Sequence, residues 1–272
     1  MIHLTFFNHI TILKQQFTKY HGAGNDFIMV DGRKNVMPAQ DPATIETMCD
    51  RHFGIGADGV IILRESENVD FKMDYFNSDG YPGTMCGNGG RCITVFAKQC
   101  GVISQQCTFE AADGLHRAEI LPNGGVKLEL GDVRNIQHIP EGYLLDTGSP
   151  HLVIFVDELE SLDVFAEGRK MREDQRFAGG TNVNFVKTSK DGIEVRTYER
   201  GVEDETLSCG TGVTASAIAS YLHTGNYGES IDVRARGGML NVSFVPGSDA
   251  NSFGEVFLTG PVTRVFDGSI DI

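Results

Sequence analysis

The feature that most constrains this chain is an internal repeat, in which the two halves carry matching motifs at a nearly constant distance. The segment from His21 to Asp31 aligns without gaps with the segment from Thr147 to Asp157. Cys86-Gly-Asn-Gly aligns with Cys209-Gly-Thr-Gly, and all matching blocks are offset by between 123 and 129 residues. Self-similarity of this kind indicates a duplicated structural unit. The repeat therefore predicts two homologous α/β domains that face each other across a cleft.

The repeat also divides the chain into segments. We expect an N-terminal domain over residues 17–133 and a C-terminal domain over residues 139–262. Residues 1–16 are expected to form an arm or an extra strand outside the main fold, the alternative being an artefactual upstream start. Residues 263–272 are expected to form a tail that returns to the N-terminal domain. A single α+β domain with coincidental glycines is the alternative to the whole division.

Short strand patterns dominate the chain, and helix patterns are fewer. Asp41 followed by Pro42 predicts a helix start, because Asp is a good N-cap and Pro fits the first helical position. Two more helices are expected after Cys86 and Cys209. The predicted strands lie between turn signals at residues 26–31, 60–64, 69–76, 126–130, 152–156, 183–186 and 193–198.

Composition limits the classes of partner. The 272 residues carry a formal net charge of -14, which repels phosphate backbones and acidic lipids, so neither nucleic acid nor a membrane is an expected partner. Six cysteines are too few for a disulfide scaffold in a chain of this length. The N-terminal segment lacks the basic region and the cleavage site of a secretory signal. We therefore expect free thiols and a cytoplasmic location.

Each Cys-Gly-x-Gly element lies between a strand pattern and a helix pattern, which places Cys86 and Cys209 at helix N-termini. Unpaired N–H groups and the helix dipole stabilise negative charge there, so we expect a lowered thiol pKa and a site for an anion. The backbone amides expected to contact that anion belong to Gly87, Asn88, Gly210 and Thr211.

Two equivalent thiols that face one carbon atom can remove a proton from one side and donate a proton on the other. This exchange inverts a stereocentre and needs one thiolate and one thiol at the same time. The α-proton of an amino acid is a very weak acid, so the two helix N-termini would have to stabilise the transition state by neutralising the carboxylate. No lysine motif for a pyridoxal Schiff base stands out, and this chemistry needs no cofactor.

The other four cysteines are expected to be structural. Cys49, Cys100 and Cys107 have no motif around them. Cys92 follows Cys86 by six residues, a spacing that fits neither a Cys-x-x-Cys redox motif nor a zinc pair. We expect these thiols to pack in the core, and we expect no metal site.

Several motifs of the chain resemble those of the diaminopimelate epimerase family. Members of this family use two cysteine side chains, and no cofactor, to epimerise an amino acid. The motifs occur in family order from about Phe17 to the C-terminus. They are His21-Gly-Ala-Gly-Asn25-Asp-Phe27, Phe53-Gly-Ile-Gly-Ala-Asp58-Gly, Tyr75-Phe-Asn77, Cys86-Gly-Asn-Gly-Gly-Arg91-Cys92, Ser149-Pro-His151, Asn182 with Phe185, and Tyr198-Glu-Arg-Gly201 ahead of Cys209-Gly-Thr-Gly. Together these motifs make the resemblance specific.

The resemblance implies an α+β fold of two pseudo-symmetric α/β domains, each a curled, mostly antiparallel sheet around a central helix. It places the active site in the cleft between the domains. The implied reaction is an isomerisation of LL-diaminopimelate to meso-diaminopimelate, which serves lysine and peptidoglycan biosynthesis. The implied partner is a small-molecule amino acid with two carboxylates.

The resemblance also implies roles for individual residues. Cys86 and Cys209 become the base and acid pair. Glu199 would bind the substrate ammonium group and, with His151, would bias the pKa values of the two thiols. The candidates for binding the rest of the substrate are Asn25, Asn77, Asn182 and Arg200, of which Arg200 suits the distal carboxylate because its guanidinium group binds in a bidentate manner.

Three positions depart from the family pattern. Ser149 stands where Asn is often found, the loop at residues 201–206 is one residue longer and more acidic, and Gly59 stands where some members carry glutamine. We expect the substrate contacts near these positions to differ in detail.

Two other functions fit parts of the same sequence. Proline and hydroxyproline racemases of this fold typically carry His where this chain has Asn88, and they lack the Tyr-Glu-Arg-Gly element that ends at Gly201. A redox-responsive binding protein could use a reversible disulfide between Cys86 and Cys209. The sequence leaves open whether the chain forms a homodimer.

Overall fold

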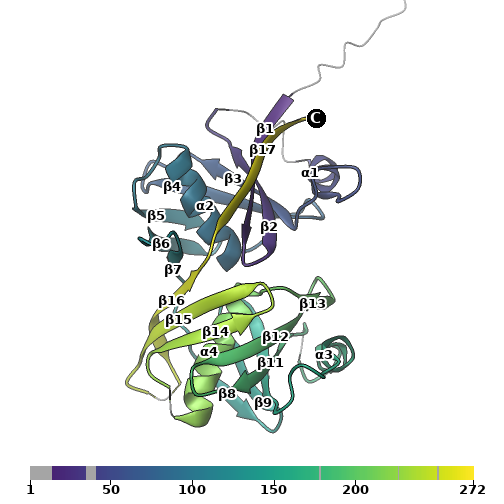
Figure 1. Cartoon of the computed structure of the whole chain (residues 1–272), viewed down its shortest axis with the longest axis vertical. Helices are drawn as coiled ribbons and strands as arrows, with labels where there is room; N and C mark the ends of the chain where they lie inside the picture. The colour runs from purple at the N-terminus through teal and green to yellow at the C-terminus, as the bar shows by residue number, and fades with distance from the viewer. Residues whose placement is uncertain (1–13, 35–40, 178, 226, 250) are drawn as a thin grey trace, which may run out of the picture.

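The computed structural model describes residues 14–34, 41–177, 179–225, 227–249 and 251–272. It has two lobes, stacked along the long axis of the molecule (Figure 1). Most of the prediction for residues 1–16 falls on residues 1–13, which lie outside the described residues. The described part of that segment, Lys14 to Gln16, belongs to the first strand of the fold.

The upper lobe of Figure 1 is built from the first half of the chain. Its elements are β1 (Lys14–Gly22), β2 (Asn25–Asp31), α1 (Pro42–Cys49), β3 (Gly59–Arg64), β4 (Phe71–Asn77), α2 (Gly87–Gln99), β5 (Gln106–Ala111), β6 (Gly114–Ile120) and β7 (Val126–Glu129).

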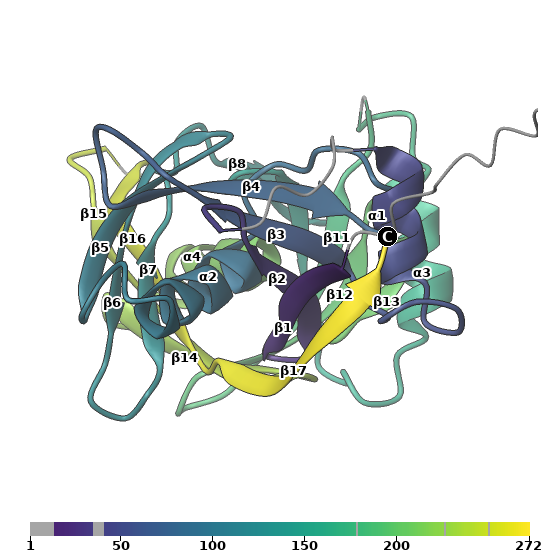
Figure 2. The ribbon, with the colours of Figure 1, turned by 90° about the horizontal axis from the view of Figure 1, so that it is seen from above.

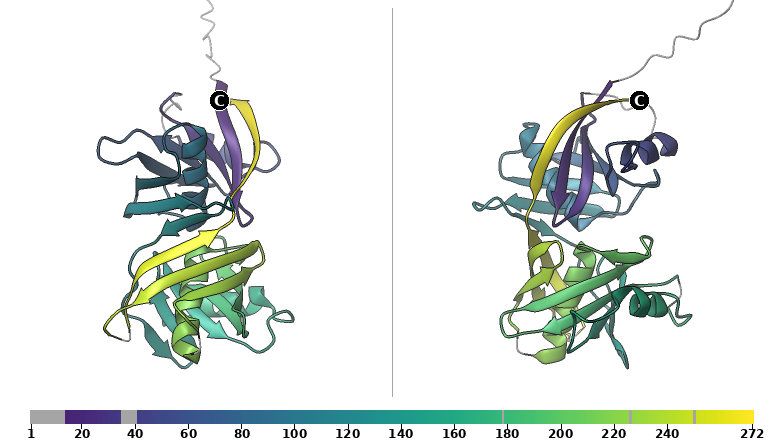
Figure 3. Two further views of the ribbon diagram at one scale, coloured as in Figure 1. Left: turned by 60° about the vertical axis from the view of Figure 1, so that its left-hand side comes forward. Right: turned by 45° about the vertical axis from the view of Figure 1, so that its right-hand side comes forward.

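The lower lobe is built from the second half. Its elements are β8 (Gln137–Ile139), β9 (Gly142–Asp146), β10 (Pro150–Phe155), α3 (Val164–Arg172), β11 (Asn182–Thr188), β12 (Ile193–Glu199), β13 (Asp204–Thr206), α4 (Gly210–Thr224), β14 (Ser230–Ala235), β15 (Gly238–Pro246) and β16 (Phe253–Gly260). The last strand, β17 (Thr263–Asp271), leaves this lobe and lies beside β1 in the upper one (Figure 3).

The strands of the described residues pair into one 17-stranded sheet, and most of the pairs are antiparallel. Each half contains two parallel pairs, which are β2–β3 and β4–β5 in the first half and β10–β11 and β12–β14 in the second. The parallel pairs occupy equivalent places in the two halves. The order of strands and helices thus repeats in the way that the matching motifs predict.

A central helix lies inside the curled sheet of each lobe. Helix α2 packs against β1, β2, β3, β6 and β7, and helix α4 packs against β9 to β12, β14 and β15. Seen from above, strands surround both central helices, whereas α1 and α3 lie on the outside (Figure 2). The prediction of an α+β fold with a mostly antiparallel sheet curled around a helix in each half is confirmed.

Small side chains allow α4 to be buried. Ala215, Ala217 and Ala219 are fully covered, and the buried hydroxyl groups of Ser216 and Ser220 donate to carbonyl oxygens one turn earlier, each at 2.7 Å. These bonds satisfy polar groups that would otherwise be costly to bury.

The two outer helices also correspond to each other. Helix α1 begins at Pro42 after Asp41, as the sequence predicts. Helix α3 was not expected from its sequence, although Asp163 caps it by accepting a hydrogen bond from the backbone N–H of Ala166 at 3.0 Å. The repeat itself contains the missing signal, because Asp41 and Asp163 precede helices at equivalent places between parallel strands.

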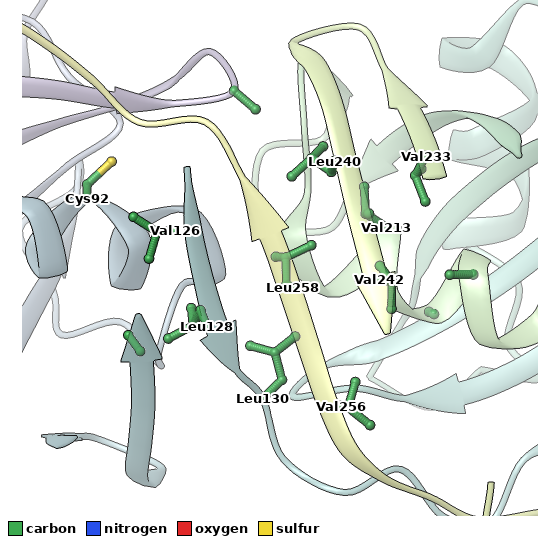
Figure 4. Close-up of a cluster of buried hydrophobic side chains, with 14 of the residues drawn as sticks. Cys92, Val126, Leu128, Leu130, Val213, Val233, Leu240, Val242, Val256 and Leu258 are labelled. Atoms are coloured by element: carbon green, nitrogen blue, oxygen red, sulfur yellow. The ribbon is translucent and has the colours of Figure 1, made fainter. Parts of the chain in front are cut away.

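Strand pairing and apolar packing join the lobes. Strand β7 of the first half pairs with β16 of the second, with Leu128 opposite Leu258. Buried apolar side chains line both sides of this pairing, among them Leu130 and Val256 (Figure 4). The interface between the lobes is therefore packed like a hydrophobic core, and this packing fixes the position of one central helix relative to the other. No helix in the described part of the chain has the length and hydrophobicity needed to span a membrane.

Candidate active site

The N-termini of the two central helices meet where the lobes join. Cys86 and Cys209 are the N-cap residues of α2 and α4, and their backbone angles are nearly the same (φ -108° and ψ 120° against φ -106° and ψ 111°). The next residues, Gly87 and Gly210, are in close contact, since a Cβ atom added to Gly210 would lie 3.4 Å from the Cα atom of Gly87. The structure thus brings the two predicted cysteines together, each at the start of a helix.

The thiol of Cys86 lies beside Asn25, at the start of β2. Its Sγ atom is 3.5 Å from the Asn25 Oδ1 atom, in position to donate a hydrogen bond. The Asn88 side chain donates to the same oxygen at 3.2 Å and to the carbonyl oxygen of Ser208 at 2.9 Å. On its other side, Asn25 Nδ2 donates to Asp58 Oδ2 at 2.6 Å. Asn25 and Asn88 are therefore held by the protein at the edge of the first thiol.

The thiol of Cys209 lies beside a different set of side chains. Its Sγ atom is 3.4 Å from the hydroxyl oxygen of Thr211. That hydroxyl is 2.9 Å from His151 Nε2 and 3.3 Å from the hydroxyl of Ser149. The other ring nitrogen of His151 is 3.0 Å from Asn184 Nδ2. A chain of hydrogen-bonding groups therefore runs from the second thiol into the core of the lower lobe.

Burial dominates the protonation of both thiols. Loss of solvent, together with the carboxylate of Glu199, raises the pKa of Cys86 to about 11, although the backbone amides of Gly89 and Asn88 act in the opposite direction. Burial and Glu199 also raise the pKa of Cys209, against hydrogen bonds from Thr211 and from the backbone of Gly212. The expected lowering by the helix N-termini is present as a contribution, but desolvation outweighs it.

Glu199 lies at the end of β12 and acts on both thiols. Its Oε2 atom accepts a hydrogen bond from the Thr206 hydroxyl at 2.9 Å, and burial raises its carboxyl pKa. The charge of Asp58 raises that pKa further. The carboxylate therefore opposes the formation of either thiolate.

Arg200 and Asn182 are linked, and they differ in exposure. The exposed Arg200 donates its backbone N–H to Asn182 Oδ1 at 2.9 Å, while its guanidinium group reaches the carbonyl oxygen of Gly179 at 3.3 Å. Asn182 is only 4% exposed, and it also donates to the hydroxyl of Ser149 at 3.2 Å. Asn182 thus connects the loop after β12 with Ser149, and the guanidinium group remains open to solvent.

The remaining predicted residues take less specific positions. Asn77 is half-buried at the end of β4, where its Oδ1 atom would lie 3.1 Å from a Cβ atom added to Gly83. His151 is fully buried, and burial with the nearby charge of Arg200 lowers its pKa to about 3, so its ring is neutral at ordinary pH.

Three residues that the sequence left without a role contact this site, namely Asp58, Arg91 and Asn184. Asp58 and Arg91 lie inside motifs recognised in the sequence, but nothing in the local pattern shows that they contact the site side chains. Asn184 lies between two apolar residues of β11, an alternation that predicts a solvent-facing side chain rather than a contact with the site. Among the described residues, no cluster of His, Cys, Asp or Glu could hold a metal ion.

The other cysteines lie apart from these contacts. Cys92 and Cys107 are buried in the main apolar cluster, and Cys49, the last residue of α1, is buried in a second one. Burial raises the pKa of Cys100 to about 11. Cys100, the C-cap residue of α2, is only half-buried at the edge of the main cluster, so the expected core packing holds for Cys49, Cys92 and Cys107.

Comparison with known proteins identifies the family. The family model for diaminopimelate epimerase matches residues 17–136 and 143–265. The diaminopimelate epimerase of Flavobacterium psychrophilum is 48% identical over 93% of this chain and 98% of its own length. That of Chlorobaculum tepidum is 41% identical over 92% of this chain and 99% of its own length.

Solved structures show the same fold at low sequence identity. A PhzF-family phenazine biosynthesis protein of Bacillus anthracis superposes with a TM-score of 0.74 at 14% identity, covering 96% of this chain and all of the other. A hydroxyproline epimerase of Agrobacterium vitis gives a TM-score of 0.70 at 16% identity, covering 95% and 93%. The motifs, the paired cysteines and the matches along nearly the whole chain agree, and the chain belongs to the diaminopimelate epimerase family.

Proposed function

We propose that this chain inverts the α-carbon of LL-diaminopimelate to give meso-diaminopimelate, with Cys86 and Cys209 as the proton-transferring pair. The observation that carries this proposal is the meeting of the two helix N-termini, each of which begins with one of these cysteines. The membership of the chain in the diaminopimelate epimerase family supplies the substrate.

In the proposed reaction, the thiolate of one cysteine takes the α-proton of the substrate, which breaks the C–H bond and forms an S–H bond. The thiol of the other cysteine then gives its proton to the opposite face of the same carbon. One proton enters and one leaves, so the reaction is redox-neutral and the two cysteines exchange protonation states. The next turnover in the same direction requires the original states to be restored by proton exchange.

The negative charge that develops on the substrate needs donors in place before the reaction. The first backbone N–H groups of α2 and α4 are suited to this role, because helix N-termini carry unpaired donors and partial positive charge. In the proposal, Gly87 and Asn88 of α2 and Gly210 and Thr211 of α4 contact the carboxylate next to the α-carbon.

The rest of the substrate is assigned to side chains around the thiols. Arg200 is proposed to bind the distal carboxylate, since its guanidinium group is exposed and is not paired with an acid among the described residues. Glu199 is proposed to bind the ammonium group, which would weaken its opposition to thiolate formation. Asn25, Asn77 and Asn182 are proposed to complete the binding site, and His151 to act on Cys209 through Thr211.

The proposal extends to the setting of the reaction. The partner is a small-molecule dicarboxylic amino acid, and the pathway is lysine and peptidoglycan biosynthesis. We propose a cytoplasmic location, supported by six free cysteines. We also propose that residues 17–133 and 139–262 are the two domains that form the site, supported by the equivalent order of their elements. A homodimer is the assembly to test first.

A deuterium experiment tests the reaction. Reduced protein is incubated with LL-diaminopimelate in heavy water without added cofactor. The isomers are then separated, and their deuterium content is determined by mass spectrometry. The expected result is meso-diaminopimelate with one deuterium at the inverted α-carbon. Turnover of proline or hydroxyproline alone would replace this proposal with the racemase alternative. Ligand binding without any turnover, abolished by oxidation of the protein, would favour the redox-responsive alternative.

A further inference from the structure

Arg91 lies in the second turn of α2 and is a buried cation. The proposed proton transfers assign it no role. The side chain is fully buried, and no carboxylate of the described residues pairs with it. Its Nε atom is buried without a hydrogen-bond partner. Burying an unpaired guanidinium group is expensive, so its presence calls for a compensating role.

Glycines of two distant segments make room for this side chain. A Cβ atom added to Gly22, at the end of β1, would lie 3.3 Å from the Arg91 NH2 atom. A Cβ atom added to Gly260, at the end of β16, would lie 3.1 Å from Arg91 Cζ. The guanidinium group therefore lies between a strand of the first half and a strand of the second, where the lobes join.

A series of hydrogen bonds leads from Arg91 toward the Cys86 thiol, and the donor and the acceptor in each bond are determined. Its NH2 atom donates to Asn88 Oδ1 at 2.9 Å. Because a guanidinium group cannot accept, this bond forces the amide nitrogen of Asn88 to the other side, where it donates to Asn25 Oδ1. Asn25 is oriented in the same sense, because its own amide nitrogen donates to Asp58 Oδ2.

Hydrogen bonds therefore link Arg91 through Asn88 and Asn25 to Asp58, and their donor-to-acceptor direction is set by the groups at both ends. Asp58 is kept as an acceptor by Arg51, whose NH2 atom lies 2.7 Å from Asp58 Oδ1. As a result, Asn25 presents its oxygen to the Cys86 thiol. The Asn88 amide also reaches the carbonyl oxygen of Ser208, the residue directly before Cys209.

We propose that Arg91 is a positioning residue of the epimerase, which orients Asn88 and Asn25 beside Cys86, ties them to the segment before Cys209, and supplies the buried positive charge that favours the Cys86 thiolate. This proposal rests on the assignment of Cys86 as one of the two proton-transferring groups. Arg91 itself is not expected to touch the substrate.

The electrostatic part of the proposal can be set against the other groups near Cys86. Glu199 on β12 opposes a thiolate there, and the charge of Arg91 favours it. Tyr75 on β4 and Cys209 at the start of α4 also lie within electrostatic reach, both as neutral groups at ordinary pH. Cys92 on α2 is a further neutral neighbour, so Arg91 is the cation of this set, and its removal should leave Glu199 unopposed and disfavour the Cys86 thiolate.

The test measures the Cys86 thiolate without relying on turnover. Wild-type protein, Arg91→Met, Arg91→Lys and the control Thr94→Val are alkylated with iodoacetamide across a range of pH, and modification of Cys86 is followed by peptide mass spectrometry. Thr94 is an equally buried polar residue of α2, and its hydroxyl interacts with the helix carbonyl of Gly90 at 2.8 Å and with the Cys107 thiol rather than with Asn88 or Asn25. In Arg91→Met, the pH at which Cys86 alkylation reaches half of its maximal rate should rise by about one unit, as expected for the loss of a nearby opposite charge.

Epimerase kinetics on the same variants separate positioning from charge. In Arg91→Met, kcat should fall by about 10-fold to 100-fold with a smaller change in KM, a loss typical of removing an orienting partner. Arg91→Lys should keep the alkylation midpoint close to that of wild type but lose part of kcat, because a lysine cannot reproduce the planar fork. Thr94→Val should match wild type in both measurements.

The proposal is overturned if Arg91→Met leaves both the Cys86 midpoint and kcat at the level of Thr94→Val. If Arg91→Met does not fold, Arg91→Gln provides the same comparison, since it keeps a donor for Asn88 and lacks the charge. It should then raise the pH midpoint for Cys86 alkylation by about one unit relative to Thr94→Val, and a Gln variant whose midpoint matches that of Thr94→Val would overturn the proposal. A protein that has no epimerase activity would refute the proposed function, whereas the alkylation series would still decide the role of Arg91.

Discussion

Asn184 Nδ2 lies 3.0 Å from His151 Nδ1, and this contact determines which ring nitrogen carries the proton. Asn184 Nδ2 also donates to the carbonyl oxygen of Leu152 at 3.3 Å, and a carbonyl can only accept, so the amide nitrogen faces the ring as a donor while Oδ1 accepts from the Thr197 hydroxyl at 3.0 Å. A neutral imidazole that accepts at Nδ1 carries its proton on Nε2, which then donates to the Thr211 hydroxyl. Thr211 is left free to donate to Cys209.

Loss of this contact should slow epimerisation. In Asn184→Ala, the ring of His151 loses the donor that fixes its tautomer, and kcat should fall by about 10-fold or more, as for other residues that orient a functional histidine. The measurement is steady-state epimerase kinetics. Thr197→Val is the matched control, since it removes the hydroxyl on the far side of Asn184 and leaves the amide next to His151. Equal losses in the two variants would contradict the tautomer argument.

Removal of either proton-transferring cysteine should abolish inversion. Cys86→Ala and Cys209→Ala are each expected to reduce formation of meso-diaminopimelate by more than about 1,000-fold, because each loses one obligatory proton transfer. Chiral chromatography of the product gives the measurement. Cys92→Ala should retain most of the activity, since Cys92 is buried in the apolar cluster. Full activity in Cys209→Ala would rule out a mechanism with two bases.

Gly168 in α3 should be required for the packing of α3 on β12. A Cβ atom at this position would overlap the side chain of Tyr198, which directly precedes Glu199 and Arg200. Gly168→Ala should lower the free energy of unfolding by about 2 kcal/mol, because the overlap outweighs the gain in helix propensity. Urea denaturation measures the change. Gly131→Ala is the control, because nothing lies within 4 Å of a Cβ atom there, and it should be close to neutral.

Buried His151 should make the protein less stable in acid. Its pKa is lowered to about 3 in the folded protein, so between that value and its ordinary pKa of about 6.5 the unfolded chain binds the extra proton. Its contribution to stability is therefore complete above pH about 6.5 and is lost as the pH falls, by about 1.4 kcal/mol per unit.

The test compares urea denaturation of wild type and His151→Gln at pH 7.5 and pH 5. The other titrating groups are common to both proteins, so the difference isolates His151. Wild type should lose about 2 kcal/mol more than the variant over this interval. Identical losses would show that the ring can be protonated in the folded protein.

Local sequence signals predicted much of the fold. The Asp41-Pro42 start of α1, the helices after Cys86 and Cys209, and strands such as β2 and β12 are all present, because caps and alternation depend on neighbouring residues. Helix α3 escaped notice because its short pattern contains Gly168, which lowers helix propensity and whose reason lies in the packing against Tyr198.

The sequence by itself determined that the chain is duplicated, that each half places a Cys-Gly-x-Gly element between a strand and a helix, and which family carries such motifs. Only the tertiary structure decided how the thiols are protonated and what holds their surroundings. Burial raises the pKa of Cys86 despite its helix N-terminus. Likewise, the contact of Arg91 with Asn88 orients the amides beside Cys86, and the contact of Asn184 with His151 sets the tautomer of the imidazole near Cys209. Desolvation and hydrogen-bond direction depend on groups brought together from distant segments, so they follow from packing and cannot be read from local sequence.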